Sequence, residues 1–105
     1  MMLLATALIT MVCTGEVFPV GTPSRREPFT TFLIIDLDGK TVTGGMCSNP
    51  TCPITRITET ELAFNKPPIA GILDRHSGKL VMGMREGGSG DSDYDLICKP
   101  ANRMF

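Results

Sequence analysis

The chain has few of the residues that build stacking surfaces, long helices and strongly charged faces. Its 105 residues include no Trp, one Tyr and one His, and its net charge is −1 at pH 7. Without a basic surface or aromatic platforms, nothing in the sequence predicts nucleic-acid binding. No window repeats apolar residues with a helical period, and eight prolines interrupt the chain, so long helices are not expected.

The chain also lacks an apolar run long enough to cross a bilayer as a helix, so no stable span is expected in the mature protein. The segment Met1–Val12 is apolar and uncharged. It resembles the hydrophobic part of a secretory signal, with Ala5–Ala7 as a candidate cleavage tripeptide, although no basic residue precedes it. If it is a signal, the protein is periplasmic or secreted; if Leu8–Cys13 is instead the first buried strand, the protein is cytoplasmic.

The residues that are abundant favour strands and turns. The chain has 11 Gly, and β-branched and aromatic residues gather in short segments between turn-forming ones. The strands predicted in this way lie at Leu8–Thr14, Phe29–Ile35, Lys40–Met46, Ile54–Thr58, Glu61–Phe64, in a hairpin at Ile69–Met84, and at Asp93–Cys98. About eight short strands in series predict one all-β domain over residues 8–105, either a small antiparallel barrel or a two-sheet sandwich. The segment Glu16–Pro28 is expected to form mainly a loop.

Two hairpins share a pattern. In the second, Asp74 is expected to set the turn by accepting backbone hydrogen bonds, and Gly78 to take a left-handed conformation. In the first, Asp36 and Gly39 are the corresponding turn-forming residues. The alignment places Gly39 on Gly78 and implies that the first loop is one residue shorter.

Four cysteines raise the question of disulfides. Cys47 and Cys52 enclose a six-residue ring, and a local disulfide there is worth about 2 kcal/mol in the loop-entropy model. Cys13 and Cys98 lie on the first and last predicted strands and would be neighbours in a closed sheet. We therefore expect the pairs Cys13–Cys98 and Cys47–Cys52, while zinc binding is the alternative that the sequence leaves open.

One segment suggests an enzyme. Phe32–Gly39 resembles the first motif of haloacid dehalogenase-type phosphatases, in which Asp36 would be the nucleophile and Asp38 the general acid/base. Gly90–Asp95 is similar to the acidic motif with which that family binds Mg²⁺. The resemblance implies phosphoryl transfer assisted by a metal ion.

Three features oppose this alternative. Lys40 stands where the family has Thr, and Gly87–Gly90 stands where a buried strand should lead into the acidic motif. The chain also has no room for alternating strands and crossover helices. His76, the single histidine, is expected in an exposed loop, and Cys47 stands where a calcium-binding EF-hand loop needs Glu. No catalytic, cofactor-binding or metal-binding residue is therefore expected.

The chain as a whole resembles small uncharacterised exported bacterial β-proteins, common in rhizobia. The matching segments are Val12–Gly15, Asp36–Thr43, Ile57–Glu61, Asp74–Leu80, Tyr94–Pro100 and the terminal Phe105. The resemblance implies a signal sequence and a β fold, but no known activity. The chain is more loosely similar to periplasmic inhibitors of C-type lysozyme, which are eight-stranded barrels. The residues that those inhibitors insert into lysozyme are not recognisable here.

Together these features predict a non-catalytic binding or structural protein of the cell envelope. Its partner would be an unknown protein or small ligand, and no cofactor is expected. The phosphatase that uses Asp36 and Asp38 is the alternative.

Overall fold

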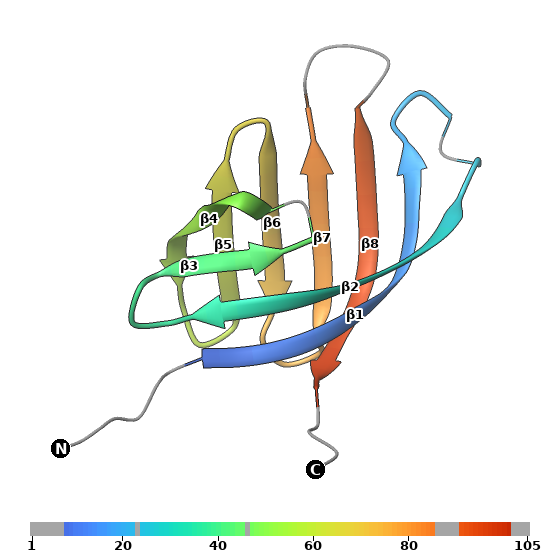
Figure 1. The fold of residues 1–105 in the computed structure, drawn as a ribbon. Coiled ribbons are helices and arrows are strands. Elements are labelled where there is room, and N and C mark those ends of the chain that lie inside the picture. The colour runs from blue at the N-terminus through green and yellow to red at the C-terminus, as the bar shows by residue number, and fades with distance from the viewer. Residues whose placement is uncertain (1–7, 23, 46, 86–90, 102–105) are drawn as a thin grey trace, which may run out of the picture.

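The computed structural model describes residues 8–22, 24–45, 47–85 and 91–101. In these ranges every regular element is a strand (Figure 1). The strands are β1 (Leu8–Pro19), β2 (Glu27–Asp36), β3 (Thr41–Gly44), β4 (Cys47–Ile57), β5 (Glu61–Lys66), β6 (Ile69–Asp74), β7 (Lys79–Met84) and β8 (Ser92–Pro100). Within the described ranges, no helix has the length and hydropathy that a membrane crossing requires.

Each strand pairs with the next in antiparallel fashion, and β8 pairs with β1, so the sheet closes into a barrel. The prediction of a small antiparallel barrel of about eight strands is confirmed, and the sandwich is not formed. Closure removes the unpaired strand edges that an open sheet of this size would present to other chains.

Side chains alternate between the interior and the outer face, as the two-residue period of a strand requires. On β2, Leu33 and Ile35 are buried while Phe32 and Ile34 are exposed. The buried apolar side chains of all eight strands form one cluster, to which β5 contributes the large ring of Phe64. Gly71 lies against that ring, where a Cβ atom would overlap it.

β1 is longer than the sequence predicts. The segment Glu16–Pro19, expected to be loop, continues β1: all four residues pair with β8, and Glu16 and Val17 also pair with β2. This pairing outweighs the weak local preference for a strand. Gly15 permits the close approach, because a Cβ atom there would overlap the backbone of Asp95. Figure 1 shows β1 curving from beside β2 to beside β8.

β4 also differs from expectation. The segment Cys47–Pro53, which lies between the predicted strands Lys40–Met46 and Ile54–Thr58, belongs to this strand and contains an irregularity. Gly44 pairs with Cys47 whereas Val42 pairs with Cys52, so a step of two residues on β3 faces a step of five on β4. The surplus residues bulge from the ladder, and the two cysteines at the base of the bulge are joined.

Candidate functional site

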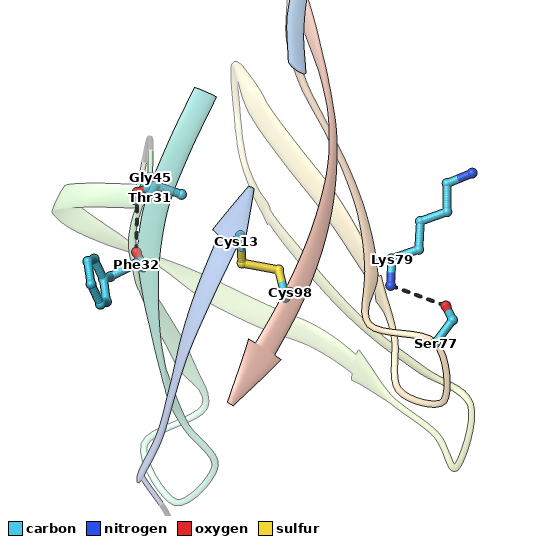
Figure 2. Close-up of a disulfide and its surroundings, with 7 residues drawn as sticks. All are labelled: Cys13, Thr31, Phe32, Gly45, Ser77, Lys79 and Cys98. Carbon is cyan, nitrogen blue, oxygen red and sulfur yellow. Dashed lines mark hydrogen bonds between the residues drawn. A yellow bond between two sulfur atoms is a disulfide. The ribbon is translucent and has the colours of Figure 1, made fainter. Parts of the chain in front are cut away.

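Both predicted disulfides are present. Cys13 on β1 and Cys98 on β8 are directly paired residues, and an S–S bond of 1.99 Å joins them inside the barrel (Figure 2). Cys47 and Cys52 are joined within β4. All four cysteines are in disulfides, so the zinc alternative is wrong. The first bond links residues 85 positions apart.

The turn between β6 and β7 is organised by Asp74. Its Oδ1 accepts hydrogen bonds from the backbone N–H groups of His76, at 2.8 Å, and Ser77, at 3.1 Å. The bonds from Ser77 and then His76 lower the pKa of Asp74 below its ordinary value of 3.8. Gly78 ends the turn in the left-handed region, with φ of 82°, and donates its N–H to the carbonyl of Asp74 at 2.9 Å.

The turn between β2 and β3 is built differently from its sequence pattern. Asp36 Oδ1 accepts the N–H of Gly39 at 2.8 Å, but the left-handed residue is Lys40, with φ of 57°. Both loops therefore have four residues between the strand ends, and Lys40, not Gly39, corresponds to Gly78. At Gly39 a Cβ atom would lie 2.7 Å from Asp36 Oδ2, so a larger residue there would shift the Asp36 carboxylate.

The carboxylates of the phosphatase alternative are far apart. Asp36 pairs with Leu8 at one end of β1, whereas Asp95 pairs with Glu16 near the other. These positions are separated by roughly 26 Å, at about 3.3 Å for each strand residue. Gly90 lies outside the described residues. Within those residues no three acidic, His or Cys side chains gather as a metal site would need. The barrel thus does not assemble the cluster that this alternative requires.

An apolar recess opens at the end of the barrel where β1 begins and β8 ends, the lower end in Figure 1. Its volume is about 230 Å³. We call it the mouth pocket; its lining residues are Ile9, Met11, Ile35, Leu37, Leu62, Leu73, Asp74, Arg75 and Gly78.

The strand register explains why these side chains meet. Ile9 pairs with Ile35, and Leu62 pairs with Leu73, so both pairs are the last inward-facing rows before the barrel ends. Ile35, Leu62 and Leu73 are almost fully buried and form the floor. Ile9 remains 39% exposed, and Leu37, in the turn after β2, is half-buried. The wall of the pocket is therefore apolar surface in contact with solvent.

The rim of the mouth pocket carries one positively charged and one negatively charged side chain. The guanidinium of Arg75 donates to the carbonyl of Thr58 at 2.6 Å, which ties the two turns at this end together. Asp74 forms no ion pair with any described residue. Arg75 also forms no ion pair with any described residue, so the rim presents a carboxylate and a guanidinium beside the apolar wall and does not favour a ligand of one sign.

A second depression, of about 360 Å³, lies on the outer face at the opposite end. It is larger but more open, with Ala70 and Gly83 as its floor, and the cis Pro67–Pro68 turn beside it. Its one charged side chain, Arg85, is engaged with Asp93 at 2.7 Å. The more enclosed mouth pocket is therefore the better candidate for a binding site, since binding sites are typically concave.

Comparison with protein-family models, curated proteins and solved structures gave no match. The function must therefore be inferred from the geometry. Sequence reasoning found Asp74 and Gly78 only as turn residues and missed the apolar lining of the mouth pocket. One signal for it exists: Leu37 is an apolar residue between two Asp residues in a turn that is otherwise polar.

Proposed function

We propose that this protein is an exported, non-catalytic binding domain of the cell envelope, and that its binding site is the mouth pocket. The observation that carries the proposal is the apolar recess itself. There the inward-facing side chains of four strands meet at one end of the barrel, with the charged side chains of Asp74 and Arg75 on the rim. Hydrophobic burial of a ligand group would supply the affinity, and the rim its orientation.

The size of the pocket limits the ligand. At about 230 Å³ it is smaller than the ~300–1,000 Å³ typical of sites that enclose a whole drug-sized molecule. It fits one apolar group, such as a side chain of a protein partner or the alkyl or aryl end of a small molecule. A polar group next to it could contact the carboxylate of Asp74 or the guanidinium of Arg75 on the rim.

Two observations support export. Disulfides persist in oxidising compartments, and here one of them closes the barrel. Furthermore, the candidate cleavage tripeptide Ala5–Ala7 immediately precedes Leu8, the first residue of β1. Cleavage after Ala7 would leave all eight strands intact. Because residues 1–7 are shorter than a signal peptide, this proposal takes the true start of translation to lie upstream of Met1.

The binding claim is tested with a fluorescent apolar probe, N-phenyl-1-naphthylamine, which is uncharged at neutral pH, titrated into the oxidised protein. Leu37→Asp places a charge in the apolar wall of the pocket, and we expect it to weaken the Kd at least tenfold. Phe32→Asp is the matched control, because Phe32 is 59% exposed on the outer face and does not line the pocket. Equal effects of the two variants, or no saturable binding, would reject the mouth pocket as the site.

A further inference from the structure

The outer face of β6 and β7 carries an apolar ridge beside a hollow. The ridge consists of Ile72 and Val81, which pair across the two strands and are 44% and 50% exposed. In the next outward-facing row Ala70 pairs with Gly83, and these small residues form the floor of the hollow, the depression of about 360 Å³ described above. The two rows are two residues apart along each strand, which is about 6.6 Å. A bulky apolar row and a row of small residues thus lie side by side on one exposed face.

This arrangement is complementary to a second copy of itself. A two-fold axis that crosses β6 and β7 midway between the two rows exchanges one row for the other. It places the ridge of each copy over the hollow of the other, with Ile72 above the partner's Ala70. The strands of the two copies stay aligned, as they do in packed sheets. Apolar side chains that are exposed in the monomer would leave water in both halves of the contact.

One wall of the hollow is the side chain of Arg85. Its guanidinium lies against the floor, because a Cβ atom on Gly83 would be 3.1 Å from Nη1. The guanidinium contacts the carboxylate of Asp93 at 2.7 Å and donates to the carbonyls of Met84 and Ser92 at 3.3 and 3.1 Å. Since a guanidinium has five N–H donors, it has capacity for a further acceptor.

The same axis brings an acceptor to this guanidinium. Asp95 is exposed, pairs with Val81 of the ridge, and forms no ion pair with any described residue. Asp93 pairs with Gly83 in the row of the hollow. Exchange of the two rows therefore places the partner's Asp95 over Asp93, beside Arg85. The guanidinium would then bridge two carboxylates, one from each copy.

We propose that the protein forms a two-fold symmetric dimer in which the ridge of each copy fills the hollow of the other. The contact follows two strands of a closed barrel, so it is smaller than the roughly 800 Å² per partner of a standard interface, and the dimer is weak. Lys79 and Asp74, in the outward row beyond the ridge, fall at the edge of the contact and stay hydrated. The mouth pocket lies at the end of the barrel and not on this face, so the inference does not depend on the proposed function.

Sedimentation equilibrium of the oxidised protein, from about 10 μM to 1 mM, tests the dimer. We expect a reversible monomer–dimer equilibrium, and Ile72→Lys should weaken its Kd at least tenfold by removing half of the ridge. Ala70→Lys, at an exposed position, fills the hollow and should act equally strongly while the ridge stays intact. Ile34→Lys is the matched control, because Ile34 is 41% exposed on β2, which pairs with neither strand of the contact, and its Kd should be unchanged.

The charge contact and the symmetry are tested separately. Asp95→Asn should weaken the dimer several-fold, and an unchanged Kd would overturn the assigned geometry. In a dimer of one isotope-labelled and one unlabelled copy, an intermolecular NOE should connect the methyl groups of Ile72 and the partner's Ala70. A protein that remains monomeric over the whole concentration range, or a dimer that Ile34→Lys dissociates as effectively as Ile72→Lys, would overturn the inference. Neither result would bear on ligand binding in the mouth pocket.

Discussion

At the scale of single residues, the two left-handed positions give opposite predictions. Lys40 has φ of 57°, a conformation that costs a residue with a Cβ atom about 1–2 kcal/mol. Lys40→Gly should therefore stabilise the protein by about 0.5–1 kcal/mol, after the higher entropy of unfolded glycine is subtracted. Gly78→Ala should destabilise it by more than that, because the new Cβ atom would also overlap the carbonyl oxygen of Cys98. Urea unfolding of both variants measures these changes, and a stabilising Gly78→Ala would contradict the structure.

A second residue-scale prediction concerns pH. The backbone hydrogen bonds from Ser77 and His76 lower the pKa of Asp74 in the folded state below the ordinary value of 3.8. The stability that its carboxylate contributes is therefore fully present above the unfolded pKa and is lost as the pH falls through the folded pKa. Asp74→Asn keeps an acceptor oxygen in the turn but cannot titrate. Its urea midpoint should fall less than that of the parent protein between pH 5 and pH 3; parallel curves would show that Asp74 does not contribute.

At the scale of elements, the two disulfides should differ in their contribution to stability. In the loop-entropy model, the Cys13–Cys98 bond contributes about 4–5 kcal/mol and the Cys47–Cys52 bond about 2 kcal/mol. The paired variant Cys13→Ala/Cys98→Ala should thus lose roughly twice the unfolding free energy that Cys47→Ala/Cys52→Ala loses. Non-reducing urea unfolding of both pairs makes the comparison. A larger loss from the second pair would mean that the bulge in β4, not the seam between β1 and β8, controls stability.

The strands were predictable from sequence where pattern and local preference agree. The segment Phe29–Ile35 is rich in β-branched and aromatic residues, and β2 spans it. The predicted pair of Cys13 and Cys98 also anticipated closure of the barrel, because it required the first and last strands to be neighbours.

Features set by contacts distant in sequence were not predictable. The segment Glu16–Pro19 is a strand because β2 and β8 flank it, and no local pattern reports those partners. Similarly, the repeated Gly-Lys pattern suggested that Gly39 corresponds to Gly78, whereas the number of residues between the paired strands gives that place to Lys40. The mouth pocket was missed because its lining is spread over β1, β2, β5, β6 and two turns.

At the scale of the whole molecule, export makes a prediction about mass. When the chain is produced in a bacterium with its natural upstream region and isolated from the periplasm without reductant, we expect loss of everything that precedes Leu8 and of four hydrogens. Ala7→Leu should block cleavage, because a signal requires a small residue at that position, while leaving β1 unchanged. A full-length protein with four free thiols, found in the cytoplasm, would contradict export.

The whole barrel also determines where a ligand can bind. Among the described residues, buried side chains from all eight strands fill the interior, and the apolar recess lies at one end. Apolar side chains are also exposed on the outer face, where Ile72 pairs with Val81 across β6 and β7. The proposed binding function therefore depends on the mouth pocket at one end of the barrel.

The most direct test of this account is a methyl NMR titration of the oxidised protein with N-phenyl-1-naphthylamine. We predict saturable shifts of the methyl signals of Met11, Leu37 and Leu73, which line the mouth pocket. The signals of Ile72 and Ile97, exposed on the outer face, should not move. Shifts confined to the outer face, or spread evenly over both sets without saturation, would contradict the claim that the mouth pocket is the binding site.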